Sequence, residues 1–285
     1  MMLRLFYMNL TDNKSPNKTV SAIIQTYNEE KNIGACIDSA RMFTDKIIVV
    51  DMQSTDKTVD LAKKMGAEVF SFPHSSYVEP AREFGIQKAN TEWVFLLDTD
   101  ERITKKVAKE ILYLIEKTES VEEERSDGRT ESVKTHYKIP RKNIFGHLKW
   151  LKYGGWWPDY QIRLINKKSF KSWSKEIHST PVITGETGYL QNPIEHYFHG
   201  DLESMVEKTI IFEDIESSLL FKASKKVKTS TFFRKFLGEL YRRLIRSFGF
   251  LDGEIGIIES IYQAFSKTIT YIYLYEKSRT IRSLP

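Results

Sequence analysis

The segment VFLLDTDER, residues 94–102, joins an apolar run to two aspartates, Asp98 and Asp100, that are one residue apart. The apolar run, together with Trp93 before it, is typical of a strand that is buried on both faces. Two carboxylates this close repel each other and raise each other's pKa unless a cation lies between them. Mg²⁺ and Mn²⁺ suit such a pair because they take oxygen ligands and keep positions for water or substrate phosphates. The segment therefore predicts a central strand that ends in a divalent-cation site.

Strand and helix patterns alternate before this segment and continue after it. We expect strands over residues 20–26, 46–51, 67–72 and 92–98, and helices over residues 29–42, 56–66, 79–90 and 103–117. Such alternation predicts an α/β fold with a mostly parallel, doubly wound sheet that is flanked by helices. Ligands of these sheets bind at the carboxyl ends of the strands, so the functional residues should follow the strands directly.

Polar residues do follow the first two predicted strands. The first strand ends in Thr26-Tyr27-Asn28-Glu29, and the second leads into Asp51-Met52-Gln53-Ser54. Taken singly, such residues also have structural explanations, since asparagine favours turns and Asp56 is a candidate helix N-cap. The sequence after the first strand, TYNEEKNIG, lacks the Gly-rich patterns of dinucleotide-binding folds and of P-loop NTPases. This argues against both of those classes.

Three segments in order resemble the nucleotide-sugar half of family 2 glycosyltransferases, which have the GT-A fold. They are AIIQTYNEEKNIGACIDSA (22–40), IIVVDMQSTDKTVDLAKKMGAEVF (47–70) and AREFGIQKANTEWVFLLDTDER (81–102), and the resemblance covers residues 19–117. It implies that Asp98 and Asp100 hold a divalent cation, Mg²⁺ or Mn²⁺, and that Asp98 also lies near the ribose. Met52-Gln53 replaces the commoner Asp-Gly or Asp-Ser turn of the family, which leaves the shape of that loop open.

The same resemblance implies a UDP-sugar site around the strand ends. Tyr27, Asn28 and Glu29 would line the nucleoside pocket. Asp51 would hydrogen-bond the base, which is usually uracil, and Arg82 would lie near the base or the diphosphate. The full set of residues assigned to nucleotide-sugar binding is Thr26, Tyr27, Asn28, Glu29, Asp51, Ser54, Arg82, Asp98 and Thr99.

The second half of the chain resembles one branch of the family, the bacterial lipopolysaccharide-core β-1,4-glucosyltransferases that act on heptose. The segments that carry this resemblance are GGWWPDYQIRLI (154–165), EIHSTP (176–181), EHYFHGDL (195–202) and FGFLDGEIG (248–256). It implies transfer of a hexose, glucose, from a UDP-sugar to a lipid-linked saccharide such as lipopolysaccharide core. In that branch a glutamate usually follows the histidine of EIHSTP, where this chain has Ser179. Its role here is either unfilled or taken by Glu176.

An inverting transfer needs a base that deprotonates the acceptor hydroxyl as it attacks the anomeric carbon. Asp159 is the first candidate, because surrounding aromatic residues would desolvate its carboxylate and raise its pKa. A turn aspartate after Pro158 is the alternative explanation, and Glu176 is the second candidate for the base.

The remaining candidates belong to the metal shell and the acceptor site. His178 is expected to complete the metal shell, although a structural histidine is an equal alternative. Trp156, Trp157 and Arg163 are assigned to acceptor binding, the tryptophans as a sugar platform or as plain core residues. His196 and His199 are expected to be structural or acceptor-site residues.

The composition divides the chain into three regions. Residues 1–18 form a polar lead-in, residues 19–200 the catalytic domain, and residues 201–285 a helical extension. Within the catalytic domain we expect a nucleotide-sugar half (19–118), a flexible insertion (119–135) and an acceptor half of short strands and loops (136–200). The single cysteine, Cys36, excludes an internal disulfide and fits a reducing compartment.

The segment 230–248 predicts a helix with one apolar stripe and a basic opposite face. Such a helix suits an anionic membrane surface, although packing on the catalytic domain is the alternative. The helix expected over 254–277 is apolar on more than one side, which suggests packing or a homo-oligomer contact. We find no apolar run long enough to span a membrane and no nucleic-acid-binding module beside the basic block. We therefore expect a cytoplasmic protein, peripheral on the inner face of the cell membrane. The alternatives are another acceptor (a polyprenyl phosphate, a protein or a capsular glycan) or a non-catalytic relative that binds nucleotide or lipid.

Overall fold

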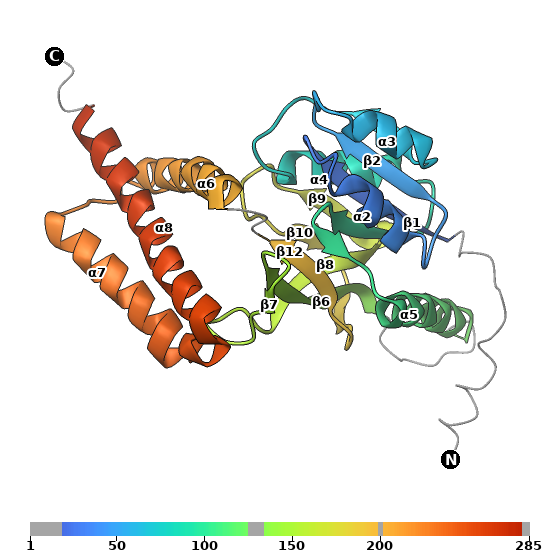
Figure 1. Ribbon diagram of the computed structural model, residues 1–285. Coiled ribbons are helices and arrows are strands. Elements are labelled where there is room, and N and C mark those ends of the chain that lie inside the picture. Colours follow the sequence, from blue (N-terminus) through green and yellow to red (C-terminus); the bar gives the residue numbers. More distant parts are fainter. Residues whose placement is uncertain (1–18, 125–133, 199–201, 281–285) are drawn as a thin grey trace.

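The computed structural model describes residues 19–124, 134–198 and 202–280 (Figure 1). The predicted lead-in, most of the predicted insertion and His199 lie outside the described residues. Residues 119–124, which we predicted to be the start of the insertion, belong to helix α5, which continues to Glu124.

The first half of the catalytic domain has the alternating elements that the sequence predicts. They are β1 (Val20–Thr26), α2 (Ile33–Ala40), β2 (Ile47–Asp51), α3 (Thr58–Lys64), β3 (Glu68–Ser71), α4 (Glu79–Lys88) and β4 (Trp93–Asp98). Their strands are parallel and lie in the order β3-β2-β1-β4, with β1 paired to both β2 and β4. The carboxyl ends of β1, β2 and β4 therefore meet at one edge of the sheet.

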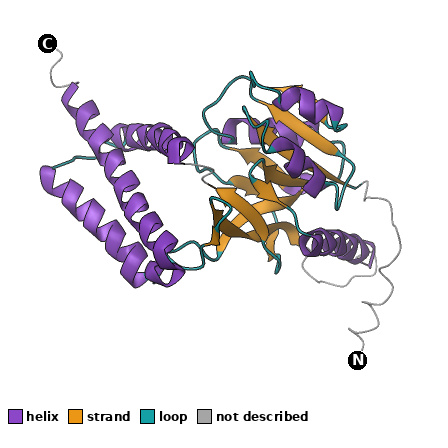
Figure 2. Ribbon diagram, in the orientation of Figure 1, coloured by secondary structure: helices purple, strands orange, loops and turns teal. Residues whose placement is uncertain are grey.

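The second half extends this sheet with strands of both directions (Figure 2). Its elements are β5 (Glu101–Arg102), α5 (Lys105–Glu124), β6 (Lys134–Phe145), β7 (Lys149–Trp150), β8 (Asp159–Asn166), the 3₁₀ turn η2 (Lys167–Ser169), β9 (Phe170–Trp173), β10 (Pro181–Ile183), β11 (Glu186–Tyr189) and β12 (Ile194–Phe198). Strand β8 runs antiparallel to β4 and β6, whereas β12 is parallel to β6 and antiparallel to β5. Strands β6, β7, β8, β11 and β12 are thus part of the same sheet, whereas β9 and β10 pair with each other in a second, two-stranded sheet.

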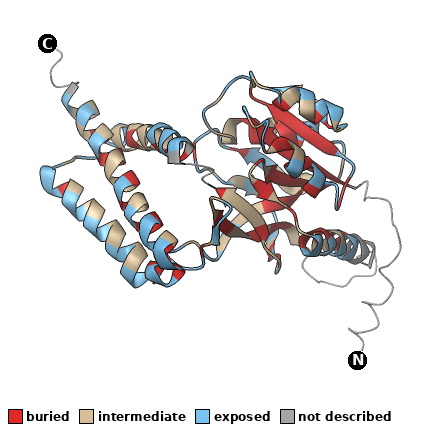
Figure 3. Cartoon of the chain, viewed as in Figure 1, coloured by how far each residue is buried: buried red, intermediate tan, exposed pale blue. Residues whose placement is uncertain are grey.

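Both faces of the sheet are covered, and its strands are largely buried (Figure 3). Phe95 and Leu97 pack in the cluster that contains residues of α2 and α5, whereas Val94 and Leu96 pack in the cluster that contains residues of α4. Successive side chains of a strand point to opposite faces, so a continuous apolar run is what a doubly covered strand requires. The rigid, buried β4 holds the residues that follow it in a fixed position.

The C-terminal region is helical and lies beside the sheet (Figure 1). It consists of α6 (Leu202–Lys222), α7 (Thr229–Leu240), a π-helix (Tyr241–Arg246), a 3₁₀ turn (Gly249–Asp252) and α8 (Gly253–Thr280). Helix α8 packs against both α6 and α7. Among the described residues, no helix is long and apolar enough to cross a membrane.

The predicted single apolar stripe over 230–248 is corrected by the structure. One set of apolar residues turns inward, as shown by Phe232, whose ring lies 5.9 Å from that of Tyr275 on α8. A second set, which includes Phe233, Leu237 and Tyr241, is exposed. The basic residues are divided as well, since Lys235 lies over the ring of Tyr271 on α8. Packing against α8 therefore uses part of both the apolar and the basic surface.

Candidate active site

The loops that follow β1 and β2 are locked together by hydrogen bonds. The backbone N–H of Asn28 donates to Ser54 Oγ at 2.8 Å, and Asn28 Oδ1 accepts from the N–H of Thr55 at 2.7 Å. Asn28 has a φ of +51° and Gln53 a φ of +66°, a conformation that asparagine tolerates better than most residues. Asp51 is buried and accepts from the N–H groups of Gln53 (3.1 Å) and Ser54 (3.2 Å). The carboxylate of Asp51 thus holds the turn that Met52-Gln53 forms.

The first loop carries a partly exposed aromatic ring and a partly buried acid. Tyr27 is half-exposed, and its ring centre lies 4.4 Å from that of His74. The carboxylate of Glu29 accepts a hydrogen bond from Asn32 at 2.7 Å, and burial raises the pKa of Glu29. The Thr26 hydroxyl is buried and has no hydrogen-bond partner among the described residues.

Asp98 is held by two arginines. Arg82 Nη2 donates to its carboxylate at 3.0 and 3.3 Å, and Arg163 Nη2 donates at 2.6 Å. Burial alone would raise the pKa of Asp98, but the two guanidinium groups hold it well below its usual range. Asp98 is therefore ionised at neutral pH.

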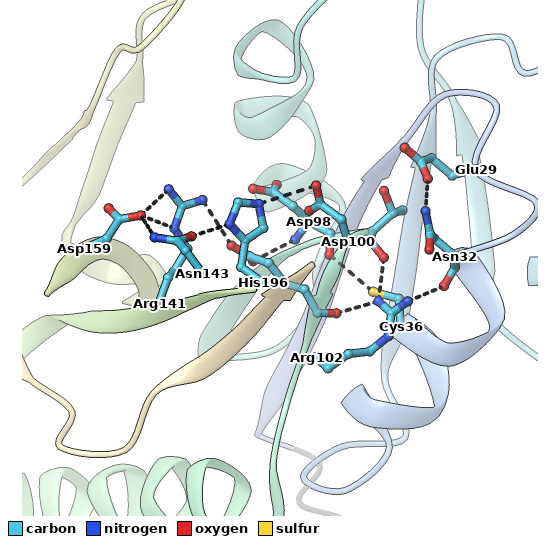
Figure 4. Close-up of polar contacts among 12 residues, drawn as sticks. Glu29, Asn32, Cys36, Asp98, Asp100, Arg102, Arg141, Asn143, Asp159 and His196 are labelled. Carbon is cyan, nitrogen blue, oxygen red and sulfur yellow. Dashed lines mark hydrogen bonds and ion pairs between the residues drawn. The ribbon is translucent and has the colours of Figure 1, made fainter. Parts of the chain in front are cut away.

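Asp100 contacts a histidine, His196, that lies far from it in the sequence. His196 Nε2, on β12, is 3.4 Å from Asp100 Oδ2, and His196 Nδ1 is 2.6 Å from Asn143 Oδ1 (Figure 4). Although burial opposes it, the pKa of Asp100 is lowered, mainly by His196. His178, the histidine expected at this place, is exposed, and its N–H donates to Glu79 at 3.1 Å. The structure thus brings His196, and not His178, into contact with Asp100.

Glu101 connects the two halves of the site, a role that the sequence did not reveal. Its side chain is fully buried, and Oε2 accepts from the N–H of Asp98 at 3.1 Å. Its other oxygen contacts Arg163 and lies 3.5 Å from Arg141. An ionic chain therefore runs from Arg82 through Asp98, Arg163, Glu101 and Arg141 to Asp159.

Asp159, the first residue of β8, ends this chain. Its Oδ2 lies 2.6 Å from Arg141 Nη2 and accepts from Asn143 Nδ2 at 3.1 Å, while its Oδ1 accepts from Gln161 at 2.8 Å. Burial would raise the pKa of Asp159, but Arg141 and the two amide donors lower it overall. The expected rise of this pKa is therefore wrong, because ion pairing outweighs desolvation.

The family follows from the amino-acid sequence that builds this site. Residues 21–173, more than half of the chain, match the family model described as Glycosyl transferase family 2. The chain is a family 2 glycosyltransferase. This confirms the family predicted from the sequence, and the mostly parallel sheet flanked by helices is the predicted GT-A fold.

Known proteins similar to this glycosyltransferase include full-length and partial matches. An uncharacterized glycosyltransferase of Rickettsia conorii is 28% identical over 276 residues, which cover 93% of each chain. The lipopolysaccharide core biosynthesis glycosyltransferase LpsC of Rhizobium meliloti is 32% identical over 96 residues, which cover 32% of this chain and 34% of LpsC. The crystal structure of S. aureus TarS 1-349 in complex with UDP-GlcNAc has a TM-score of 0.46 at 15% identity, and the match covers 92% of each chain.

The residues of this glycosyltransferase that best fit a divalent cation are Asp100 and His196. Neighbouring ligands of one Mg²⁺ ion lie about 3 Å apart, and the 3.4 Å between Asp100 Oδ2 and His196 Nε2 is close to that. An oxygen with an imidazole nitrogen suits Mn²⁺ as well. Among the described residues no cluster of three or more potential ligands occurs. The two side chains thus fit a cation that takes its remaining ligands from water or substrate.

The other predicted site residues of the glycosyltransferase differ in burial and in the contacts they make. Trp156 stacks on Phe198 with ring centres 4.7 Å apart, and Trp157 is partly exposed. Arg163 is 3% exposed, and this burial argues against the direct acceptor contact that we expected. Thr99 is buried and its carbonyl accepts from Arg102, whereas Glu176 is exposed on the loop after β9.

Proposed function

We propose that this glycosyltransferase is an inverting enzyme that moves a hexose, glucose, from a UDP-sugar to a lipid-linked saccharide such as lipopolysaccharide core. The observation that carries the proposal is that two series of side-chain contacts connect Asp98 and Asp100, the proposed donor-site residues, to Asp159. One is the ionic chain through Arg163, Glu101 and Arg141. The other runs from Asp100 through His196 and Asn143. A site that must align a leaving group, a sugar and a base needs such a rigid support.

Arg82 supports binding of the donor diphosphate. Its Nη2 is used by Asp98, but its Nη1 is buried and has no hydrogen-bond partner among the described residues. A buried N–H without a partner is costly, and a phosphate oxygen would satisfy it. The guanidinium also lies 5.2 Å from the ring centre of Trp173, which keeps it in place.

The reaction assigns one proton to Asp159. The acceptor oxygen attacks the anomeric carbon from the face opposite the nucleotide, and the bond from that carbon to the diphosphate oxygen breaks. The bonding electron pair leaves with UDP, and the hydroxyl proton passes to the Asp159 carboxylate. The lowered pKa of Asp159 keeps it ionised before the reaction, and Arg141 and Asn143 fix its orientation.

We propose Mg²⁺ or Mn²⁺ as the cofactor, held by Asp100 and His196. Asp98, which its two arginines already neutralise, is left to contact the ribose. A bound cation would neutralise the diphosphate leaving group. His178 stays a candidate ligand only if its loop approaches Asp100 when the donor binds.

The acceptor proposal rests on the branch resemblance of the second half and on the partial match to LpsC. A glycolipid acceptor would place the enzyme at the inner face of the cell membrane, as a peripheral protein of the cytoplasm. The alternatives are a polyprenyl phosphate, a protein or a capsular glycan, with the same residues in the same roles. A non-catalytic relative that binds nucleotide or lipid is the alternative of another class.

Calorimetric titration with UDP and measurement of UDP-glucose hydrolysis test the proposal. We expect UDP binding that requires Mn²⁺ and that Asp100→Asn weakens at least about tenfold. Asp159→Asn should lower hydrolysis about 10²- to 10⁴-fold and leave UDP affinity unchanged, because Asp159 lies at the acceptor end of the ionic chain. The matched variant Glu176→Gln should leave both unchanged.

Other results of the same two measurements would contradict the roles of Asp159 and Asp100. If Glu176→Gln abolishes hydrolysis and Asp159→Asn does not, the two residues exchange roles. If UDP binds equally well without a divalent cation and in Asp100→Asn, the cation site is wrong. Binding without any hydrolysis in the unmodified protein would support the non-catalytic alternative.

A further inference from the structure

An apolar tip projects where the π-helix turns into α8. We define the apolar tip as Tyr241, Ile245, Phe248, Phe250 and Leu251, whose exposed fractions are 61%, 49%, 54%, 44% and 53%. The residues are close together in the sequence, and the rings of Phe248 and Phe250 are 6.3 Å apart. A contiguous exposed group of large apolar side chains usually marks an interaction site.

The backbone is built to hold the tip outward. Phe248 has a φ of +56°, a left-handed conformation that is rare for a bulky residue. Gly249 after it is buried, and a Cβ there would lie 2.6 Å from Ser260 Oγ and 2.8 Å from the carbonyl of Arg243. Strained backbone of this kind persists where the surrounding structure enforces it, often at functional sites. A π-helix directly before the turn is a second such feature.

The same turn holds the loop that leads to the active site. Asp252 Oδ2 accepts from the N–H groups of Lys152 (2.9 Å) and Tyr153 (2.8 Å), and the Ser247 carbonyl accepts from the N–H of Gly154 (2.8 Å). Arg243 Nη1 donates to the Gly154 carbonyl at 3.1 Å, and its guanidinium lies over the ring of Trp156. We call residues 151–157 the acceptor loop, since only Pro158 separates it from Asp159.

The charges around the tip indicate which partner it fits. Arg246 and, on the acceptor loop, Lys152 are exposed, and so is Arg242, whose guanidinium also forms an ion pair with Glu239. Aromatic and aliphatic side chains flanked by arginine and lysine suit the headgroup region of an anionic membrane. A second copy of the chain would cover the apolar residues too, but a symmetric interface would bring the same basic residues face to face. The membrane is therefore the better match.

We infer that the apolar tip inserts into an anionic membrane surface and thereby holds the acceptor loop beside the lipid. The docking surface is thus the exposed apolar side of the π-helix together with the turn that leads to α8, rather than the basic face of the whole segment 230–248. That the docked loop meets a lipid-linked acceptor rests on the proposed function. Docking itself does not, because it requires neither nucleotide nor turnover.

Vesicle sedimentation tests the inference with the full chain and without nucleotide. Vesicles of phosphatidylcholine mixed with phosphatidylglycerol should bind the protein, and vesicles of phosphatidylcholine alone should bind it much less. The double variant Phe250→Ser/Leu251→Ser should lose on the order of tenfold or more in affinity, since two apolar side chains no longer leave water. The matched control Phe233→Ser/Leu237→Ser removes residues of α7 that are even more exposed. It should change vesicle binding by less than about twofold, because these side chains bury little area on the membrane.

A fluorescent label gives a second readout. Cys36 is the single cysteine and is buried, so Leu251→Cys can be labelled selectively with an environment-sensitive dye. Its emission should shift to the blue on anionic vesicles, and a label at Leu237→Cys should not shift. Equal binding by the tip double variant and the unmodified protein, or an equal loss in the control, would refute the tip as the docking surface. A concentration-dependent dimer that the tip variant abolishes, without vesicle binding, would assign the surface to a second copy instead.

Discussion

Replacing Arg163 with methionine removes a buried cation that contacts both Asp98 and Glu101. Glu101 is fully buried, so water cannot replace the lost partner. Removing one partner of a buried ion pair typically costs about 3–5 kcal/mol. Asp98 keeps Arg82 at 3.0 Å, and Glu101 keeps the longer contact to Arg141 at 3.5 Å. We therefore expect Arg163→Met to lower the free energy of unfolding by about 3 kcal/mol, the lower end of that range.

The same variant should change how stability depends on pH. The lowered folded-state pKa of Asp98 means that its contribution is present above the unfolded pKa and is lost as the pH falls through the folded pKa. Without Arg163 the folded pKa rises, so the contribution becomes smaller and is lost at a higher pH. Urea unfolding at neutral and mildly acidic pH measures both effects.

A surface pair provides the control. Lys168→Met removes the contact of Lys168 with Glu92, and the Lys168 side chain is 73% exposed. Such pairs contribute at most about 1 kcal/mol. In the double variant Arg163→Met/Glu101→Gln, part of the loss should be recovered, with a coupling of about 1–3 kcal/mol. If Arg163→Met lowers the free energy of unfolding by less than about 1 kcal/mol, or if Arg163→Met and Lys168→Met lower it equally, the ionic chain does not stabilise the fold.

Two further predictions concern the helical region. Burial raises the pKa of Glu259 on α8 from 4.5 to about 7. The protonated side chain therefore contributes its full stabilisation of the fold below pH 4.5, and this contribution is lost as the pH rises through about 7. The free energy of unfolding of Glu259→Gln, relative to that of the unmodified protein, should therefore rise by roughly 2–3 kcal/mol from acidic pH to about pH 8. Urea unfolding at both pH values measures this, and a difference between the two proteins that does not vary with pH would contradict it. Asp252→Ala removes the acceptor of two backbone N–H groups and should cost about 1–3 kcal/mol. Hydrogen exchange should then speed up at Lys152 and Tyr153, whereas unchanged protection of these amides would show that Asp252 does not hold the loop.

The first half of the fold is predictable because its physics is local. Strands β1, β2 and β4 are rich in apolar residues and buried on both faces, and their observed bounds lie within a residue of those predicted. The second half follows a weaker pattern. Strand β6 has twelve residues, mixes polar with apolar side chains and contains Pro140, which normally argues against a central strand. Its strand character comes from pairing with β8 and β12, and no short window of sequence records that pairing.

The site divides in the same way. Asp98, Arg82 and Asp159 are recognisable as candidates because each has a place in a motif, and the structure joins them through one ionic chain. His196 was assigned only a structural or acceptor-site role, because its approach to Asp100 depends on a strand pairing between distant parts of the chain. Glu101 lies within the opening motif itself. The sequence cannot show that its carboxylate turns back into the protein and is fully buried there.

The pairing of β5 with β12 matters for anyone who would recombine this enzyme with its relatives. Arg102 pairs with Glu195 and Glu101 with His196, and the Tyr197 N–H donates to the Asp100 carbonyl at 2.8 Å. A histidine on the acceptor side is thereby held in register with the aspartate on the donor side. A chimera that exchanges the second half of the catalytic domain must therefore contain a β12 that can pair with β5. Otherwise the exchange would displace the residues that contact Asp100. Crossover points that keep residues 98–102 and 194–198 from one parent should yield folded, nucleotide-binding hybrids more often than crossovers that separate them.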